Sequence, residues 1–123
     1  MPEKETTLNI ETFDNLKKLM GSNFTFLLQE YLKSAENFII QIQSATANNN
    51  TSELATAAHP LKSSSAQIGA VSVRDIAEKI ELAAQSGGFP EGSDESFTHL
   101  LSQLETSFSD LKATLSPHVS FPG

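Results

Sequence analysis

The stretch Ala58-His59-Pro60-Leu61-Lys62-Ser63-Ser64-Ser65-Ala66-Gln67-Ile68-Gly69-Ala70 combines one histidine and one lysine with small side chains and has a glycine, Gly69, next to its end. On an α-helix of about 3.6 residues per turn, His59 and Lys62 lie on the same face. A separate stripe at helical spacing runs about one position away from His59 and consists of Leu54, Ala58, Leu61, Ser65 and Ile68. The pattern predicts a helix that buries this stripe and leaves His59 at the border of the core, facing solvent.

This central helix has its own start and stop signals. Asn50, with Glu53 three residues later, resembles a capping box and predicts the helix start. Gly69 suits the left-handed backbone position that ends many helices. Pro60 removes the backbone hydrogen bond to the carbonyl of Thr56, at a cost of about 3 kcal/mol. Because the apolar stripe keeps its phase across Pro60, we expect one helix with a kink.

Two helices are predicted before this stretch. The first is short, runs from about Ile10 to Met20 and stops at Gly21. The second is long, is capped by Ser22 or Asn23, and has the strongest apolar periodicity in the sequence. Its apolar residues recur every three or four positions: Phe24, Leu27, Leu28, Tyr31, Leu32, Ala35, Phe38, Ile39 and Ile42.

Two more helices are predicted after it. Ser72, with Asp75 three residues later, is expected to open the fourth helix, which ends at 86–90. Ser93 is expected to start the fifth helix, and Pro117 prevents its continuation. The predicted buried stripes are Val73, Ile76, Ala77, Ile80 and Ala84 in the fourth helix, and Phe97, Leu101, Leu104, Phe108, Leu111 and Leu115 in the fifth.

These patterns predict an all-α protein, because the period-two alternation of strands is absent. Four helices of useful length joined by short loops indicate an antiparallel up-down four-helix bundle, with the short additional N-terminal helix covering one end. We expect the bundle to span residues 9–115. Residues 1–8 are expected to be an N-terminal tail or linker, and residues 116–123 a C-terminal tail.

Length and composition exclude several classes of protein. The 123 residues suit a single domain, and the net charge of −7 with eight scattered Lys and Arg argues against nucleic-acid binding. The absence of cysteine excludes a disulfide framework, a thiolate metal site and a cysteine nucleophile. No signal-peptide pattern or long apolar run is present. We therefore expect a cytoplasmic monomer without membrane contact.

The fourth helix is expected to bring polar groups to His59. In a helical hairpin centred near Ala70, His59 lies eleven residues before the turn and Glu81 eleven after it, at about the same height. Glu81 is therefore expected to hold one ring nitrogen and leave the other free as a nucleophile for a phosphoryl donor. Lys62 would offset the charge of the product, and Gln85 is expected to contact the ring or a group attached to it.

The run Ala58-His59-x-Leu61-Lys62-x-Ser64-Ser65-Ala66-x-Ile68-Gly69-Ala70 resembles the signature of histidine-containing phosphotransfer (HPt) domains of bacterial multistep phosphorelays. The resemblance extends to Leu27-Leu28 and Tyr31-Leu32 in the second predicted helix and to Ile80-Glu81 and Ala83-Ala84 in the fourth. It covers most of residues 9–115. The four-helix bundle of that family agrees with the architecture expected from the periodicity.

The resemblance implies roles for individual residues. His59 would accept the phosphoryl group, Lys62 would be the lysine beside it, and Glu81 would stand where the family has a Gln or Glu bound to the imidazole. The implied activity is transfer between His59 and aspartates of response-regulator receiver domains, with a hybrid sensor histidine kinase as a further partner. The domain would be a carrier rather than an enzyme, because the receiver supplies the acidic pocket and Mg²⁺. No cofactor or metal of its own is expected.

Two residues near His59 depart from the family pattern. The first is Pro60, which directly follows the histidine inside the helix, and the second is Ser63. Ser63 occupies a position where many members have glycine. Its hydroxymethyl group is expected to restrict a phosphoryl group on His59 or to hydrogen-bond it.

Two other functions remain open on sequence alone. The chain could be an HPt-like interaction module that regulates a kinase or receiver by binding, without being phosphorylated. It could also be a hydrolytic or metal enzyme that uses His59 with Glu78 or Glu81. His99 and His118 have no partner at metal-ligand spacing.

Overall fold

The computed structural model describes residues 7–119 and shows no strand in that range. The α-helices are α1 (Ile10–Met20), α2 (Phe24–Ala47), α3 (Thr51–Ile68), α4 (Val71–Gln85) and α5 (Phe97–Leu115). Two short 3-10 helices, η1 (Gly21–Asn23) and η2 (Ser116–His118), lie before α2 and after α5. The predicted all-α class is confirmed.

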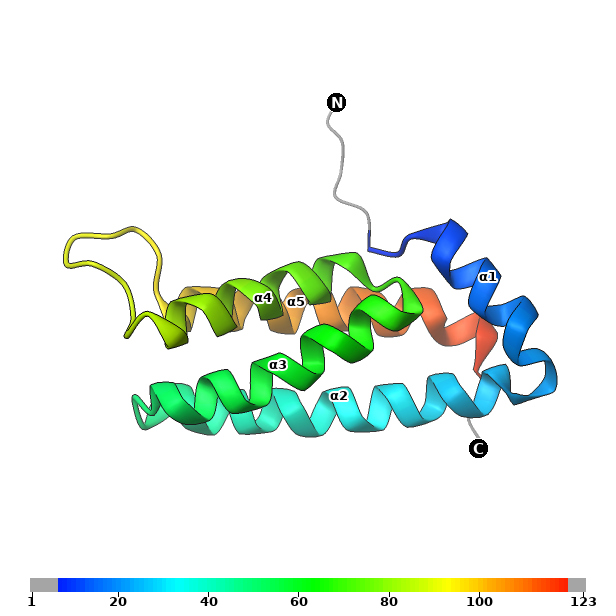
Figure 1. The fold of residues 1–123 in the computed structure, drawn as a ribbon, viewed down its shortest axis with the longest axis horizontal. Coiled ribbons are helices and arrows are strands. Elements are labelled where there is room, and N and C mark those ends of the chain that lie inside the picture. Colours follow the sequence, from blue (N-terminus) through cyan, green and yellow to red (C-terminus); the bar gives the residue numbers. More distant parts are fainter. Residues whose placement is uncertain (1–6, 120–123) are drawn as a thin grey trace, which may run out of the picture.

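Helices α2 to α5 run side by side along the long axis of the molecule (Figure 1). Each of the four packs against two of the others, in the order α2, α3, α4, α5 and back to α2, so together they close a bundle. Successive helices point in opposite directions, and α1 lies across the end of the bundle where α3 turns into α4. The predicted antiparallel four-helix bundle with an additional N-terminal helix is confirmed.

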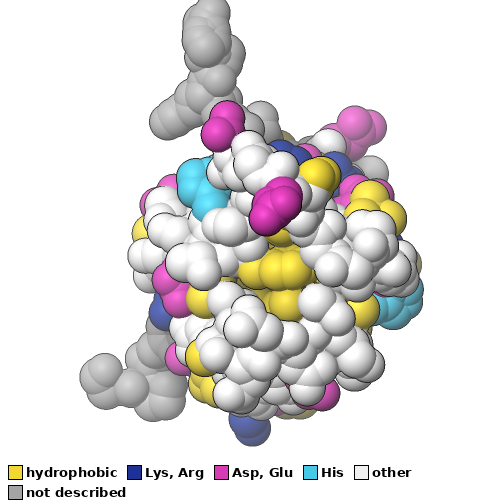
Figure 2. All heavy atoms as spheres, turned by 90° about the vertical axis from the view of Figure 1, so that its left-hand side faces the viewer, with side chains coloured by type: hydrophobic (Ala, Val, Ile, Leu, Met, Phe, Trp, Pro, Cys, Tyr) yellow, Lys and Arg dark blue, Asp and Glu magenta, His cyan; other side chains and the backbone are white. Residues whose placement is uncertain are grey.

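The two ends of the bundle differ in how they are covered. Figure 2 looks onto the end formed by the α2–α3 turn and the α4–α5 loop, and hydrophobic side chains show in a hollow at its centre. At the opposite end, Phe13 of α1 packs edge-on against the rings of Phe24 (centroids 5.0 Å apart) and His118 (4.9 Å). Helix α1 thus covers that end of the bundle and is held there by the two ring contacts of Phe13.

Helix α1 is also fixed to the turn that leads from α3 into α4. Asn9 caps α1 by accepting a hydrogen bond from the Thr12 amide (3.0 Å), and its own amide donates to the Gly69 carbonyl (2.7 Å). Leu8 and Val119 are each only 6% exposed, although both lie in segments predicted as tails. Residues 1–6 and 120–123 of those segments lie outside the described residues.

The core follows the predicted stripes closely. All five residues of the α3 stripe are buried, and Leu61 is fully so. Several predicted core residues are only partly buried: Leu27, Phe38, Ile76, Phe97 and Leu101. In α5 the buried residue is Leu100 rather than Leu101, because spacings of three and four residues both satisfy a helical stripe and only packing chooses between them.

The predicted limits of α3 are confirmed. The Asn50 side chain accepts a hydrogen bond from the Glu53 amide (3.1 Å), and Gly69 adopts the left-handed conformation with φ of 84°. The helix runs from Thr51 to Ile68 without a break at Pro60. One continuous helix therefore carries both His59 and Lys62, as the phase of the apolar stripe predicts.

The predicted starts of three other elements need correction. Neither Ser22 nor Asn23 caps α2 through its side chain, because η1 leads directly into α2 with Asn23 already in a helical conformation. Helix α4 begins at Val71 after Ala70, with no side-chain cap, so Ser72 lies inside the helix. Ala70 occupies the N-cap position, and its methyl side chain has no oxygen to accept a hydrogen bond from the first turn of α4.

Helix α5 begins three residues later than predicted. Ser96, not Ser93, is its N-cap and accepts a hydrogen bond from the His99 amide (3.0 Å). The Ser93 hydroxyl accepts from the Glu95 amide (3.1 Å) within the loop. Both serines make local side-chain to backbone bonds, and sequence alone does not tell a loop turn from a helix cap.

Within residues 7–119, no helix has the length and apolar character needed to cross a membrane.

Candidate functional site

His59 projects from the middle of α3 on the side away from the core. Ala58 and Leu61 on either side of it are completely buried, which fixes the rotation of the helix about its axis. The His59 side chain is 63% exposed. The prediction that His59 borders the core and faces solvent is therefore confirmed, and its ring is open to an approaching molecule.

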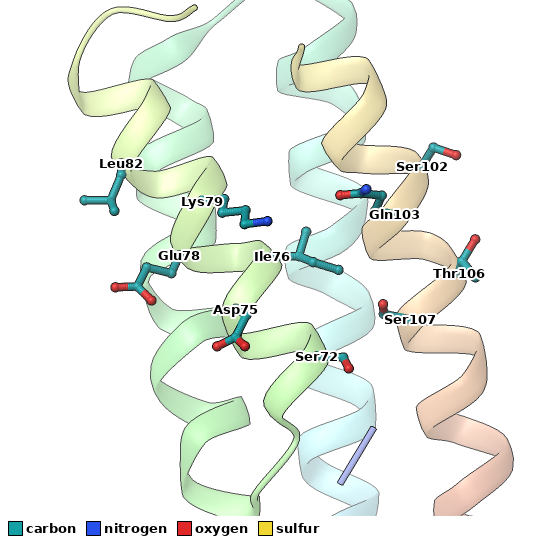
Figure 3. Close-up of a pocket in the computed structure, with 10 residues that line it drawn as sticks. All are labelled: Ser72, Asp75, Ile76, Glu78, Lys79, Leu82, Ser102, Gln103, Thr106 and Ser107. Atoms are coloured by element: carbon teal, nitrogen blue, oxygen red, sulfur yellow. The ribbon is translucent and has the colours of Figure 1, made fainter. Parts of the chain in front are cut away.

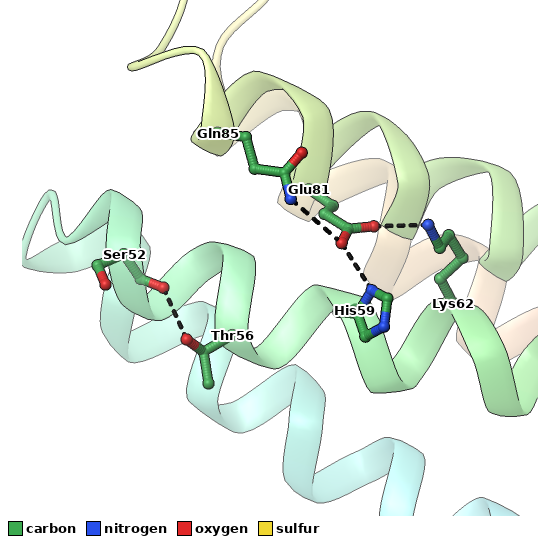
Figure 4. Close-up of polar contacts among 6 residues, drawn as sticks. All are labelled: Ser52, Thr56, His59, Lys62, Glu81 and Gln85. Carbon is green, nitrogen blue, oxygen red and sulfur yellow. Dashed lines mark hydrogen bonds and ion pairs between the residues drawn. The ribbon is translucent and has the colours of Figure 1, made fainter.

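Glu81 on α4 reaches the imidazole from the neighbouring helix, as the hairpin register predicts. Its Oε2 lies 2.7 Å from His59 Nδ1, while the Glu81 side chain is only 7% exposed (Figure 4). An ionised carboxylate has no hydrogen to donate, so Nδ1 is the donor in this contact. The Glu81 contact therefore selects the tautomer with hydrogen on Nδ1 and leaves the lone pair on Nε2.

Lys62, one turn after His59 on α3, binds the second oxygen of the same carboxylate. Its Nζ lies 2.7 Å from Glu81 Oε1, and the Lys62 side chain is 29% exposed. The hydrogen bond from Lys62 lowers the pKa of Glu81 below its ordinary value of 4.5; burial opposes this shift, and the His59 bond adds to it. The same bond raises the pKa of Lys62 above 10.5, and burial again opposes the shift. Both groups are therefore charged at neutral pH.

This shared carboxylate is the feature that the sequence interpretation missed. Lys62 was expected to act on the product at His59, and Glu81 on the ring, as two separate contacts. The structure joins Lys62, Glu81 and His59 into one chain of contacts. The three-residue spacing between His59 and Lys62 already contained the signal, because one buried carboxylate opposite that face can reach both side chains.

Gln85, at the end of α4, lies one turn beyond Glu81. Its Nε2 is 3.5 Å from Glu81 Oε2, so it contacts the carboxylate at the limit of a hydrogen bond rather than the ring (Figure 4). Ser63 lies in the turn of α3 that follows His59 and is exposed. Thr56, in the preceding turn, points its hydroxyl back to the Ser52 carbonyl (2.9 Å). Small, accessible side chains therefore flank the ring along α3.

The other candidate groups do not join this site. His99 contacts Gln103 (Nε2 to Nε2, 3.2 Å), and His118 packs on Phe13. Among residues 7–119, no group of three or more His, Cys, Asp and Glu side chains is arranged to hold a metal ion.

A groove of about 800 Å³ lies between α4 and α5 (Figure 3). The residues that line it are Ser72, Asp75, Ile76, Glu78, Lys79, Leu82, Ser102, Gln103, Thr106 and Ser107. His59 is not among these lining residues.

An exposed imidazole in contact with a buried carboxylate, on a closed four-helix bundle, is the arrangement expected of a histidine phosphotransfer domain. The sequence model of the Hpt domain matches residues 27–114, so the chain belongs to this family and has a role in phosphorelay signal transduction. The fold is similar to that of histidine-containing phosphotransfer protein B (HptB) from Pseudomonas aeruginosa PAO1. That comparison has a TM-score of 0.84 and 19% identity and covers 94% of this chain and 96% of HptB.

Similar folds also occur outside bacteria. Yeast Ypd1p matches with a TM-score of 0.77 and 17% identity, over 94% of this chain and 95% of that one. A histidine-containing phosphotransfer protein from rice matches with a TM-score of 0.75 and 20% identity, over 90% of this chain and 78% of that one. No curated protein sequence matches the chain. At these identities the structural likeness shows the fold, which is shared by proteins from a bacterium, yeast and a plant.

Proposed function

We propose that His59 is the phosphoryl acceptor of this domain and that Nε2 is the nucleophile. The observation that carries the proposal is the 2.7 Å contact between His59 Nδ1 and the buried Glu81 carboxylate, on a ring that is 63% exposed. Glu81 orients the ring, so the Nε2 lone pair points away from the carboxylate and toward solvent. The aspartyl phosphate of a partner can then approach Nε2 without moving the helices.

The transfer step forms one bond and breaks another. The Nε2 lone pair attacks phosphorus, and the phosphorus–oxygen bond of the aspartyl phosphate breaks with its electron pair passing to the departing carboxylate. Lys62 provides positive charge near the phosphoryl oxygens, and Gln85 supports Glu81 from the next turn of α4. We propose that the exposed hydroxyl of Ser63 hydrogen-bonds the new group or limits how a partner approaches it.

The proposed partners are response-regulator receiver domains and a hybrid sensor histidine kinase. Ypd1 from Saccharomyces cerevisiae, which has a similar fold (TM-score 0.64, 15% identity, 92% of this chain and 90% of that one), has been crystallised with the receiver domain of its downstream response regulator Ssk1. We extend that mode of association to this chain. The receiver would supply catalysis and Mg²⁺, and this domain would act as a monomeric cytoplasmic carrier without a cofactor or metal of its own.

The proposal is tested by treating the wild type and His59→Gln with a small phosphoramidate and measuring intact mass. The expected result is one acid-labile phosphoryl group on the wild type and none on His59→Gln. Because the side chain is exposed, His59→Gln should keep the helical circular dichroism spectrum of the wild type. Its thermal midpoint should be lower, because the buried Glu81 Oε2 loses its short hydrogen bond to the ring. His99→Gln is the matched control and should be labelled like the wild type.

Other results would favour the remaining functions. A wild type that binds a receiver domain but gains no phosphoryl group would indicate an interaction module that acts by binding alone. Loss of the fold in His59→Gln would show that the histidine has a structural role. Hydrolysis of a test substrate that depends on Glu78 would favour the enzyme interpretation.

A further inference from the structure

The ring proton of His59 faces an anion that has little access to water. Glu81 Oε2 accepts a hydrogen bond from His59 Nδ1 (2.7 Å), and Glu81 Oε1 forms an ion pair with Lys62 Nζ (2.7 Å). The Glu81 side chain is only 7% exposed. Gln85 Nε2 also lies near Oε2, but at 3.5 Å it is at the limit of a hydrogen bond. If the ring lost its Nδ1 proton, a buried carboxylate oxygen would lose its short hydrogen bond, which is costly where water cannot replace it.

This arrangement matters most after phosphorylation. With the phosphoryl group on Nε2, a ring that keeps Nδ1–H carries a positive charge, and the Glu81 carboxylate 2.7 Å from Nδ1 stabilises that charge. When the phosphorus–nitrogen bond then breaks, its electron pair returns to Nε2 and the leaving group is a neutral imidazole. A ring without the Nδ1 proton would have to leave as an imidazolate anion or take up a proton first.

We propose that the Glu81 carboxylate keeps phosphorylated His59 protonated on Nδ1, so that the phosphoryl group enters and leaves without any proton transfer. Glu81 is in this sense a positioning residue for a proton as well as for the ring. The inference rests on the proposed function of His59 and adds that the phosphorylated domain is held in its reactive form at neutral pH. A neutral amide at position 81 would lack the charge that holds the proton.

The charged groups around the ring nitrogen come from two helices. Lys62 on α3 and Glu81 on α4 are in direct contact, and Glu78, one turn earlier on α4, acts on Lys62 at longer range. Glu78 is exposed and therefore provides a matched control. Glu78→Gln removes the same charge from the same helix without touching the His59 contact.

The test compares the wild type, Glu81→Gln and Glu78→Gln after labelling with a small phosphoramidate and removal of the donor. Loss of the phosphoryl group is followed by intact mass from about pH 5 to about pH 9, a range that spans imidazole titration. The rate of loss should fall as the pH rises and the phosphorylated ring loses its Nδ1 proton. In the wild type and Glu78→Gln, this fall should occur at least about one pH unit higher than in Glu81→Gln. At about pH 8, Glu81→Gln should then lose its label about tenfold more slowly. The phosphoryl oxygens titrate in all three proteins, so their effect is common to the comparison.

Coincident pH profiles for the wild type and Glu81→Gln would overturn the inference. A second measurement needs no variant: in phosphorylated wild type labelled with ¹⁵N, Nδ1 should have the chemical shift of a protonated nitrogen at about pH 8, above the ordinary range for imidazole. An unprotonated Nδ1 at that pH would also overturn it. Failure of the wild type to accept any label would instead refute the proposed function, so the two failures are distinguishable.

Discussion

Lys62 Nζ lies 2.7 Å from Oε1 of Glu81, on the carboxylate oxygen that His59 does not use. Before phosphorylation, the positive charge of Lys62 is therefore already paired. A phosphoryl group on Nε2 brings new negative charge to within a helical turn of that lysine. The Lys62 ammonium then interacts with two anions, the Glu81 carboxylate and the phosphoryl group. The Lys62–Glu81 pair thus ties the charge balance of the site to whether His59 is occupied.

Lys62→Ala is expected to lower the fraction of protein that is phosphorylated at equilibrium. The charge-assisted contact to the phosphoryl oxygens is lost, and we expect a decrease of roughly tenfold in occupancy. Quantitative intact mass after labelling with phosphoramidate measures it. Lys79→Ala, which changes a lysine in the groove between α4 and α5, should retain wild-type occupancy. Equal occupancy in Lys62→Ala and Lys79→Ala would show that Lys62 does not stabilise the phosphoryl group on His59.

The lowered pKa of Glu81 predicts a pH dependence of stability. The Lys62 hydrogen bond is the largest cause of the shift and outweighs burial, so the native pKa lies below the ordinary 4.5. Between the two values the unfolded chain binds more protons, so the free energy of unfolding rises with pH there. The stabilisation is complete above about pH 4.5 and is lost as the pH falls through the native pKa.

Urea unfolding of the wild type and Glu81→Gln between about pH 3 and about pH 6 tests this dependence. The difference in free energy of unfolding between the two proteins should shrink as the pH falls. The raised pKa of Lys62 acts in another window, since its contribution is lost only as the pH rises through a value above 10.5. A difference that stays constant down to the lowest pH would contradict the predicted coupling.

A buried hydrogen bond between α2 and α3 lies behind the site. Tyr31 Oη and Ser65 Oγ are 2.7 Å apart, and burial raises the pKa of Tyr31 to about 12, although the Ser65 bond opposes the shift. Tyr31→Phe leaves the Ser65 hydroxyl without this partner in the core and should cost about 1 to 3 kcal/mol in urea unfolding. Labelling of His59 should stay at the wild-type level.

The double variant Tyr31→Phe with Ser65→Ala isolates the pair in that experiment. Removing both polar groups should cost less than the sum of the single changes, because neither hydroxyl is then left unpaired. Additive costs would show that the two hydroxyl groups stabilise the bundle independently.

Local signals in the sequence were enough for the central helix and its register. Asn50 and Gly69 mark the ends of α3 because each acts through its own side chain or backbone within a few residues. The same turn, centred near Ala70, set the height at which Glu81 faces His59. The contact between His59 and Glu81 could therefore be predicted by counting residues.

Choices made by packing could not be predicted in this way. Leu100 and Leu101 fit the α5 stripe equally well, and only the neighbouring helices decide that Leu100 is buried. Ser93 and Ser96 both have the chemistry of a cap, and the choice depends on where the α4–α5 loop meets α5. The spacing of His59 and Lys62 lets both side chains reach one carboxylate, but only the side-chain conformations decide that Lys62 pairs with Glu81.

Gly69 and Gly87 have similar backbone conformations but different surroundings. Comparing an alanine substitution at each position therefore distinguishes backbone strain from steric crowding. Gly69 and Gly87 have φ of 84° and 92°, so alanine is strained at either position. A Cβ at Gly69 would lie 2.9 Å from the Asn9 carbonyl oxygen and 3.2 Å from Thr12 Cβ, whereas one at Gly87 would meet nothing within 4 Å. Gly87→Ala should therefore cost about 1 kcal/mol, and Gly69→Ala about 1 to 2 kcal/mol more, because α1 must move away from the turn between α3 and α4.

Urea unfolding measures both costs. Hydrogen exchange of the Asn9 amide, which donates to the Gly69 carbonyl at 2.7 Å, should become faster in Gly69→Ala alone. Equal costs with unchanged exchange would show that α1 is not held by this close approach.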